Sequence, residues 1–246
     1  MKIYLSNDIG MQDKKDGSPV TKADLAANKI ILDDLEKLTP AIPIISEETF
    51  STNNTDHGHQ LFWIIDPLDG TREFINKSDE FTVNIGLIEN GKPVFGIVGC
   101  PSLKKMWSGS IYDKRPVDVF NEKDPIRVVM SKSHQTEIDK LFLDFLNSSG
   151  VSFNIIEKGS SLKICSLANG EADFYPRFGP TSEWDIAAAD GYLQSRGGVI
   201  LKAVDFTPLD YGKTDSILNP QFYGFRNNLV KQKITPLLRE FSKKLL

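Results

Sequence analysis

Apolar positions in the first part of the chain predict one amphipathic helix and two buried strands. Between Thr21 and Pro40, apolar residues recur at the three- and four-residue spacing of a helix: Leu25, Ile31 or Leu32, Leu35 and Leu38. The short apolar runs at 42–45 and 61–65 are typical of buried strands, and each run leads directly into acidic residues. We therefore expect a helix followed by two strands that end in carboxylates.

Residues 81–89 and 93–100 predict a β-hairpin. They flank Asn90-Gly91, a dipeptide that favours a type I′ turn because both central residues of that turn need a positive φ. The stretch 115–125 that follows is polar and rich in turn residues, so it is the expected boundary between two lobes. We expect residues 1–120 to form an α+β lobe in which helices cover an antiparallel sheet.

Beyond this boundary, strand-like and helix-like segments alternate. Strands are predicted at 126–131, 153–156, 172–175 and 199–201. Helices are predicted at 136–146, 161–168 and 185–195. This alternation is typical of α/β layers, so we expect residues 121–246 to form a C-terminal α/β lobe and the protein to be of the α/β class.

Composition and charge exclude several classes of protein. The 246 residues carry 29 Lys and Arg against 33 Asp and Glu, with no basic block, so no nucleic-acid polymer is expected as a partner. No apolar run approaches the roughly 20 residues that span a membrane, and residues 1–7 are too short and polar for a signal peptide. Cys100 and Cys165 lie far apart, which favours a reducing, cytoplasmic location.

The most informative segment runs through Asp66-Pro67-Leu68-Asp69-Gly70-Thr71. A predicted buried strand delivers two carboxylates three residues apart, around a proline that stiffens the turn. Gly70 lets the backbone approach a ligand, and Thr71 offers a hydroxyl. If a helical turn begins near Thr71, its free N–H groups favour an anion. The alternative is an ordinary type I turn, for which Asp-Pro-x-Asp-Gly is also typical.

Two further acidic residues are expected to join these carboxylates. Glu47 follows the preceding strand, and adjacent strand ends would bring it near Asp66 and Asp69. Asp185 opens an apolar helix, a place where the helix dipole alone also favours a carboxylate. Converging carboxylates repel one another unless cations lie between them, and Mg²⁺ prefers oxygen ligands of this kind. The chain has three histidines, so a zinc hydrolase is not expected.

Taken in order, these motifs resemble those of the inositol monophosphatase superfamily of Mg²⁺-dependent, lithium-sensitive phosphatases. Within it, the chain resembles the bacterial 3′(2′),5′-bisphosphate nucleotidases of the CysQ type. Further similar stretches extend the resemblance over nearly the whole chain: 16–24, 72–75, 81–85, 159–165, 175–180 and 208–211. The resemblance implies the layered αβαβα fold of inositol monophosphatases and a role in sulfur metabolism.

The resemblance also implies a metal site and catalytic residues. In the family, the matching positions bind two Mg²⁺ ions, and a third ion is often proposed. The implied ligands are Glu47, Asp66, the backbone carbonyl of Leu68, Asp69 and Asp185. A metal-bound water would attack the phosphate in line, oriented by Thr71 with the help of Asp24, and Glu47 is counted with these catalytic residues. Read alone, Asp24 is an acid in the first turn of a helix; Glu48 either completes the outer metal shell or faces solvent.

Substrate contacts are implied at Asp69, Gly70, Thr71, His134, Ser160, Lys163, Arg177 and Asp185. Gly159-Ser160-Ser161 precedes a predicted helix and could hold a phosphate with its backbone N–H groups. Arg177 could engage a phosphate through two donors. Read alone, Lys163 and Arg177 would more often be solvated surface charges, and His134 could equally cap the following helix.

The implied reaction is hydrolysis of adenosine 3′,5′-bisphosphate to AMP and phosphate, with removal of the 3′-phosphate of 3′-phosphoadenylyl sulfate as a second reaction. An inositol or other sugar monophosphate is the alternative substrate, and a non-catalytic binder of metal and phosphonucleotide is the second alternative. We expect a small phosphonucleotide as the partner and a monomer or homodimer. Some relatives are peripheral to the inner membrane, but no basic amphipathic helix here demands that location.

The sequence departs from the family pattern at its beginning. Relatives typically carry a further helix before the segment that matches 8–16, whereas only residues 1–7 stand there in this sequence. We expect an exposed apolar groove where such a helix would pack, with lower stability or self-association as the result.

Overall fold

Two five-stranded sheets, a two-stranded ribbon and six helices make up the part of the chain that the structure describes. The computed structural model describes residues 1–6, 8–14, 17–50, 60–117, 120–121, 123–132 and 136–245. The helices are α1 (Lys22–Leu38), α2 (Thr71–Ile75), α3 (Glu137–Ser148), α4 (Leu162–Ala168), α5 (Glu183–Ser195) and α6 (Asn228–Leu245). The ribbon consists of β1 (Gln12–Asp13) and β2 (Pro19–Val20). The first sheet contains β3 (Ile44–Ser46), β4 (Leu61–Asp69), β5 (Thr82–Glu89), β6 (Lys92–Cys100) and β7 (Lys105–Ser110). The second sheet contains β8 (Ile126–Ser131), β9 (Phe153–Lys158), β10 (Phe174–Arg177), β11 (Val199–Lys202) and β12 (Phe222–Phe225).

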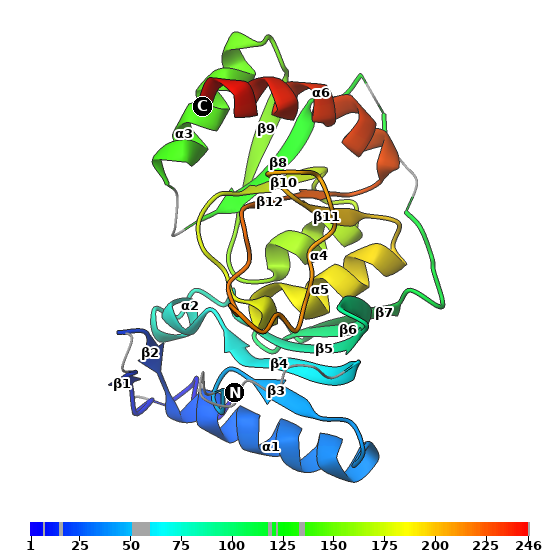
Figure 1. Cartoon of the computed structure of the whole chain (residues 1–246). Helices are drawn as coiled ribbons and strands as arrows, with labels where there is room; N and C mark the ends of the chain where they lie inside the picture. The colour runs from blue at the N-terminus through cyan, green and yellow to red at the C-terminus, as the bar shows by residue number, and fades with distance from the viewer. Residues whose placement is uncertain are drawn as a thin grey trace.

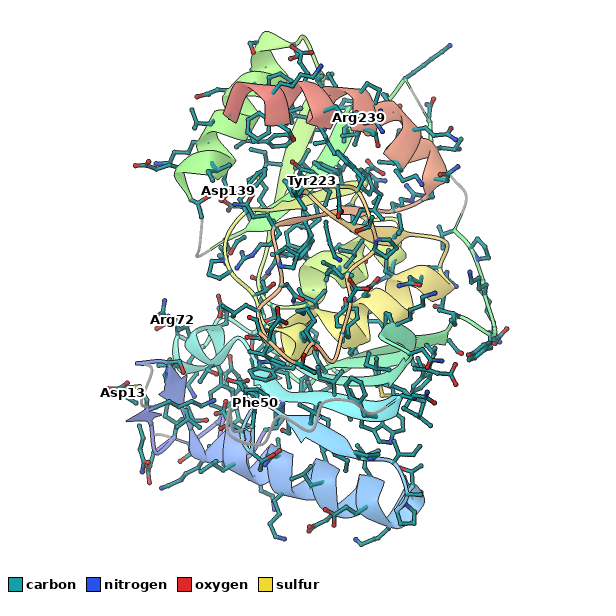
Figure 2. The ribbon with its side chains drawn as sticks, in the orientation of Figure 1. Asp13, Phe50, Arg72, Asp139, Tyr223 and Arg239 are labelled. Carbon is teal, nitrogen blue, oxygen red and sulfur yellow. The ribbon has the colours of Figure 1, made fainter. Side chains whose placement is uncertain are left out.

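The elements are stacked in five layers (Figure 1). The first sheet lies on α1, the pair α4 and α5 lies between the two sheets, and α3 and α6 cover the far face of the second sheet. The middle helices bury apolar side chains against both sheets. A second core beneath α3 and α6 includes the ring of Tyr223 (Figure 2). This is the αβαβα arrangement that the sequence resemblance implies. None of the described helices is long and apolar enough to cross a membrane.

The first sheet has the strand order β3-β4-β5-β6-β7. β3 runs parallel to β4, and every other neighbouring pair is antiparallel. The predicted hairpin is confirmed, because Asn90 and Gly91 join β5 to β6 with φ values of 51° and 74°. β4 extends beyond the predicted apolar run to Asp69, so the acidic segment belongs to the strand itself. β7 was not predicted from the sequence.

The second sheet has the strand order β11-β12-β10-β8-β9. β8 is parallel to β9 and β10, whereas β12 is antiparallel to β10 and β11. Every predicted strand and helix of this half is present, with shifted ends, but β12 and α6 were not predicted. The two sheets are joined by the connection from β7 to β8, which contains the stretch 115–125. The division into two lobes stays a prediction.

Helix α5 binds the two halves of the chain together. It belongs to the second half by sequence, yet it packs on the first sheet. A Cβ atom added at Gly96 of β6 would lie 1.8 Å from the carbonyl oxygen of Ala188 in α5, so helix and strand touch through their backbones. Because α5 is buried on nearly all sides, its N-terminal residues are held in a fixed position against the first sheet.

Helix α1 covers only one side of the outer face of the first sheet. The predicted helix is present, but Leu25 and Leu38 are 54% and 76% exposed, whereas Leu35 is buried. Farther along the same face, Phe95 of β6 is partly buried and Met106 of β7 is 73% exposed. The inward face of α1 is therefore narrower than the sequence pattern predicts, and apolar side chains remain accessible over β6 and β7.

Asp190 forms a buried polar link between α5 and the loop that precedes β12. Its side chain accepts hydrogen bonds from the hydroxyl of Tyr211 at 2.8 Å and from Nε2 of Gln194 at 3.1 Å. Asp190 is 1% exposed, and burial raises the pKa of its carboxyl group to about 6, although both hydrogen bonds oppose this rise. The folded state therefore holds a proton on Asp190 more tightly than the unfolded chain does.

We expect the free energy of unfolding to contain a contribution from Asp190 that falls as pH rises from about 4 to about 6, because an acid whose pKa is raised on folding favours the fold only while it is protonated. Replacing Asp190 with asparagine should remove this pH dependence. Between about pH 4 and 6, the free energy of unfolding of the wild type should fall by about 3 kcal/mol more than that of D190N. Urea denaturation between pH 4 and 8 would measure this. The exposed residue Asp144 of α3 provides the control D144N, and a D190N curve parallel to the wild type would contradict the expectation.

Candidate active site

The acidic end of β4 provides the first two carboxylates of the site. The pairing of β4 with β5 shifts in register between Asp66 and Asp69, so the strand bulges where the sequence reads Asp-Pro-Leu-Asp. Oδ1 of Asp66 accepts a hydrogen bond from the backbone N–H of Leu68 at 2.9 Å. Gly70 then adopts a left-handed conformation with a φ of 91°, and α2 begins at Thr71. The predicted helical turn is confirmed, and the alternative of an ordinary type I turn is wrong.

Asp185 completes a cluster of three carboxylates at this point. One oxygen each from Asp66, Asp69 and Asp185 lies within 4.8 Å of the others. Burial, reinforced by the neighbouring negative charges, raises the pKa of Asp66 well above its usual value. Burial and the charge of Asp69 raise the pKa of Asp185 to about 8. Asp66 and Asp185 therefore resist ionisation beside a third carboxyl group, that of Asp69, and a divalent cation with oxygen ligands would supply the missing positive charge.

Glu47 and Glu48 lie beside this cluster in an ion pair with Lys14. Nζ of Lys14 is 2.7 Å from Oε1 of Glu47 and 2.8 Å from Oε1 of Glu48. Glu47 lines the same cavity as Asp69 and Asp185 and repels the charge of Asp66, so the strand ends converge as expected. The side chain of Glu48 is 4% exposed, so the interpretation that it faces solvent is wrong.

Asp24 and Thr71 meet next to the acidic cluster. The hydroxyl of Thr71 donates to Oδ1 of Asp24 at 3.2 Å or to the carbonyl of Leu68 at 3.3 Å. The other carboxylate oxygen of Asp24 accepts from the backbone N–H and the hydroxyl of Thr21, which forms the capping box of α1. Asp24 therefore has the ordinary helix-start role and also contacts Thr71.

The turn between β9 and α4 holds Asp69 from the other side. Ser160 has a φ of 44°, and its hydroxyl donates to the carbonyl oxygens of Asp69 at 3.0 Å and Glu80 at 2.5 Å. The backbone N–H of Ser161, expected from the sequence to face a ligand phosphate, donates to Oδ2 of Asp69 at 2.7 Å. A Cβ atom at Gly70 would lie 2.4 Å from Oγ of Ser160, so glycine is required there. Contacts of Gly70 and Ser160 with substrate stay predictions.

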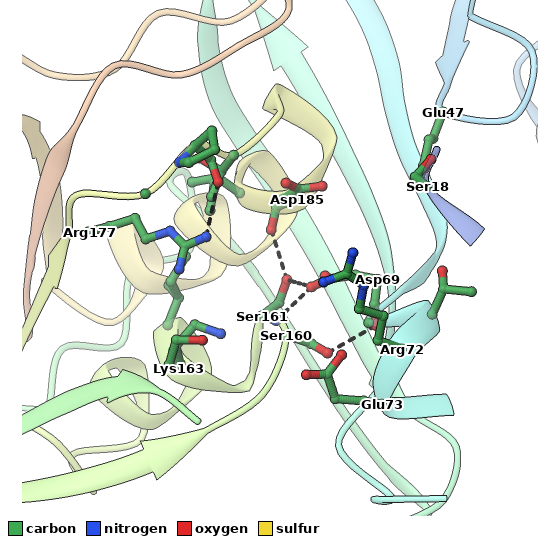
Figure 3. A pocket seen from close by; sticks show the side chains of 18 of the residues that line it. Ser18, Glu47, Asp69, Arg72, Glu73, Ser160, Ser161, Lys163, Arg177 and Asp185 are labelled. Atoms are coloured by element: carbon green, nitrogen blue, oxygen red, sulfur yellow. Dashed lines mark hydrogen bonds between the residues drawn. The ribbon is translucent and has the colours of Figure 1, made fainter. Parts of the chain in front are cut away.

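A cavity of about 720 Å³ joins the acidic cluster to a cationic end formed by Lys163 and Arg177 (Figure 3). Lys163 is 8% exposed, and its side chain makes no hydrogen bond or ion pair within the described ranges. Burial, aided by repulsion from Arg177, lowers the pKa of Lys163 to about 8, although Asp69 opposes the shift. Arg177 donates to the carbonyl of Pro180 at 3.0 Å, and its buried Nε lacks a hydrogen-bond partner among the described residues.

Other residues of the cavity were not identified from the sequence. They include Ser18, Arg72, Glu73, Thr136, Tyr175 and Thr181. Arg72 and Glu73 belong to the short helix after the acidic strand, where only the sequence similarity of 72–75 pointed to them. His134, predicted as a nucleotide contact, lies outside the described residues, and its role stays a prediction.

The layered α/β fold and its carboxylate cluster define a protein suited to a divalent cation and an anionic ligand, and the comparisons with known proteins agree. The model of the inositol monophosphatase family matches residues 1–240. The chain therefore belongs to the inositol monophosphatase family.

Similar proteins within the family carry a more specific name. The 3′(2′),5′-bisphosphate nucleotidase CysQ of Salmonella typhimurium is 43% identical over 217 residues, which are 85% of this chain and 86% of that protein. The CysQ protein of Haemophilus influenzae is 30% identical, over 90% of this chain and 86% of its own. The crystal structure of CysQ from Bacteroides thetaiotaomicron superposes with a TM-score of 0.78 at 33% identity, covering 91% of this chain and 90% of that one. An inositol monophosphatase of Thermotoga maritima, 21% identical, shares the fold with a TM-score of 0.75 over 100% of this chain and 93% of that one.

Proposed function

We propose that this chain is a metal-dependent phosphatase that hydrolyses adenosine 3′,5′-bisphosphate to AMP and phosphate. The observation that carries the proposal is a single cavity with an acidic cluster at one end and two cations, Lys163 and Arg177, at the other. A substrate with two separate phosphates matches both ends, because one phosphate can meet the metal while the other meets the cations. The relatives of 30–43% identity named above are bisphosphate nucleotidases.

The acidic end fits Mg²⁺, and we propose two or three ions per site. Asp66, Asp69 and Asp185 would hold the metal together with Glu47 and the backbone carbonyl of Leu68, which are all hard oxygen ligands. When bound, such ions lower the pKa of a coordinated water and neutralise charge on the phosphoryl oxygens. Glu47 would have to exchange Lys14 for the metal, because Lys14 is its partner in this structure.

Thr71 and Asp24 would orient the attacking water. The Thr71 hydroxyl lies within hydrogen-bond distance of Oδ1 of Asp24. While its proton is directed to this carboxylate, the lone pairs of Thr71 Oγ1 are free to accept a hydrogen bond from the water. Asp24 is 1% exposed and its second oxygen is held by Thr21, so the pair is a fixed acceptor.

Lys163 and Arg177 would bind the second phosphate, which is the 5′-phosphate when the 3′-phosphate is cleaved. Both cations point into the cavity (Figure 3) and have no carboxylate partner in the described part of the chain, so their desolvation costs free energy unless an anionic ligand completes the site. Arg177 can offer two parallel donors and Lys163 one compact charge. The same pair would also meet the second anionic group of 3′-phosphoadenylyl sulfate.

Two other functions remain to be separated from this one. An inositol or sugar monophosphatase would use the same acidic end, but a single phosphate leaves the cationic end without a ligand. A non-catalytic binder of metal and phosphonucleotide would not require the Thr71–Asp24 pair. We also propose that the chain acts in the cytoplasm on a small substrate; whether it is a monomer or a homodimer stays a prediction.

Phosphate release from adenosine 3′,5′-bisphosphate and from inositol 1-phosphate, each with Mg²⁺ and each repeated with EDTA or Li⁺, tests the proposal. We expect the bisphosphate to be preferred by kcat/KM, with release abolished by EDTA and reduced by Li⁺. A strong preference for inositol 1-phosphate would contradict the substrate assignment. No release from either compound, combined with tight binding of the bisphosphate, would favour the non-catalytic binder.

A further inference from the structure

We propose that Ser161 is a positioning residue that fixes which oxygen of Asp69 faces the metal. The inference rests on the proposed function, because it takes Asp69 to be a metal ligand. Ser161 is 2% exposed and lies in the turn between β9 and α4, far from Asp69 in sequence. Its backbone N–H and its hydroxyl both reach Oδ2 of Asp69, at 2.7 Å and 2.8 Å.

Oδ2 of Asp69 is saturated with donors. Besides the two bonds from Ser161, it is 3.2 Å from the hydroxyl of Thr82 and 3.4 Å from the amide nitrogen of Asn84. Thr82 and Asn84 are fully buried on β5, so these donors have fixed positions. A carboxylate oxygen accepts about two hydrogen bonds well, so the shorter pair from Ser161 already fills it. Only Oδ1 of Asp69 remains for the cation.

The Ser161 hydroxyl also contacts the first turn of α5, which carries Asp185. Its Oγ is 2.8 Å from the backbone carbonyl of Asp185 and accepts a hydrogen bond from Nδ2 of Asn84 at 2.8 Å. The hydroxyl has one proton, and the charged Asp69 oxygen is a stronger acceptor than the carbonyl of Asp185. Ser161 thus lies at the point where β4, β5, α4 and α5 meet, and its side chain contacts two of the proposed metal-binding residues, Asp69 and Asp185 (Figure 3).

The turn that carries Ser161 is itself held rigidly. The preceding residue, Ser160, is in the left-handed region, and its hydroxyl is bonded to the carbonyls of Asp69 and Glu80. A Cβ atom at Gly159 would lie 2.9 Å from the Glu80 carbonyl oxygen, so the turn packs directly on the loop that connects α2 to β5. Residues that orient the ligands of a metal in this way change its affinity by about 10–100-fold when they are replaced.

Replacing Ser161 with alanine tests the proposal, with Ser166→Ala as the matched control. Ser166 lies in α4, the helix that follows Ser161, is also buried at 3% exposure, and donates its hydroxyl to the carbonyl of Leu162 at 2.8 Å, away from the acidic cluster. Mn²⁺ is the probe, because it accepts the same oxygen ligands as Mg²⁺ and its free ion is counted by electron paramagnetic resonance. Ser161→Ala should weaken Mn²⁺ binding by about 10–100-fold, whereas Ser166→Ala should leave it within about threefold of the wild type.

Asp69→Ala is measured in parallel to separate the two assignments. If Asp69→Ala loses Mn²⁺ binding and Ser161→Ala does not, the role of Ser161 is overturned and the metal site stands. If Asp69→Ala binds Mn²⁺ like the wild type, the metal assignment fails and the role of Ser161 fails with it. Equal weakening in Ser161→Ala and Ser166→Ala would also overturn the proposal, because general loss of packing would explain both.

Two further measurements keep the test decisive if Ser161→Ala does not fold. Ser161→Cys keeps the size of the side chain but donates a weaker hydrogen bond, so its Mn²⁺ affinity should fall between those of the wild type and Asp69→Ala. Raising Mg²⁺ should restore phosphate release by whichever Ser161 variant folds, since the ligand is misaligned and not removed. An affinity of Ser161→Cys equal to that of the wild type, or release that no Mg²⁺ concentration restores, would contradict a positioning role.

Discussion

Replacing Asp66 with asparagine should stabilise the metal-free protein and abolish its hydrolytic activity. Asn keeps the oxygen that accepts from the Leu68 N–H and removes a carboxyl group whose ionisation is opposed by burial and by three neighbouring acids. The melting temperature without metal should therefore rise, by about 2–4 °C for each kcal/mol of relieved repulsion. Phosphate release should fall by at least about a thousandfold, because a metal ligand contributes several kcal/mol to charge neutralisation in the transition state.

Melting curves with and without Mg²⁺ would measure the first effect. Metal should raise the melting temperature of the wild type and leave that of D66N nearly unchanged. D66N should therefore have the higher melting temperature without Mg²⁺ and the wild type the higher one with it. The gain of D66N without metal should be larger at neutral and higher pH than at acid pH, because the cost of a raised pKa develops above the ordinary carboxyl pKa, where the unfolded chain has released its proton. A D66N protein that melts below the metal-free wild type, or that still hydrolyses substrate with Mg²⁺, would contradict the assignment.

Replacing Lys163 with methionine should separate the two candidate substrates. Loss of a buried cation that meets a phosphate costs about 2–5 kcal/mol, so kcat/KM for adenosine 3′,5′-bisphosphate should fall by about 30- to 5,000-fold. Turnover of inositol 1-phosphate should change little, because its single phosphate meets the acidic end. The control is K140M, which removes an exposed lysine of α3. Equal losses for both substrates would show that Lys163 does not bind a second phosphate.

The pH dependence of the same reaction provides an independent check on Lys163. Its pKa of about 8 means that the free enzyme loses this positive charge as pH rises through 8. Because kcat/KM reports ionisations of the free enzyme, its value for the bisphosphate should decline above about pH 8 in the wild type. At pH 9, K163R should retain a larger fraction of its kcat/KM at neutral pH than the wild type does, since a guanidinium stays charged. Superimposable profiles would count against a lysine in the phosphate site.

Much of the fold could be predicted from local sequence patterns. The Asn90-Gly91 hairpin was predictable because the turn chemistry is local, and the strand β8 because its apolar run is bounded by polar residues. β12 could not be predicted, because its run Phe-Tyr-Gly-Phe is short and interrupted by glycine. It becomes a strand through its pairing with β10 and β11. α6 contains Pro236, which reads as a helix breaker when tertiary contacts are unknown.

The acidic residues of the candidate site could be predicted from the sequence, but the residues that contact them could not. Asp66 and Asp69 follow an apolar strand, which is a local signal, whereas Asp185 lies far along the chain and was expected beside them from the chemistry of converging carboxylates and from the family resemblance. The pairing of Lys14 with Glu47, and of Ser161 with Asp69, joins residues that are far apart in the chain. Such pairs are set by how the five layers stack, and nothing in the local sequence of Ser161 distinguishes it from any serine at the start of a helix.

The close contact of Gly96 with Ala188 has a consequence for how this protein could be divided. A fragment ending in the 115–125 connection would contain Asp66 and Asp69 but leave the inner face of its sheet bare, because α5 would be on the other fragment. That second fragment would carry Asp185 on α5 without the strands of the first sheet against which this helix packs. Neither piece could assemble the three-carboxylate cluster alone, so co-expressed halves should recover metal binding only as a pair. The connection is a candidate position for a split reporter whose signal depends on reassembly.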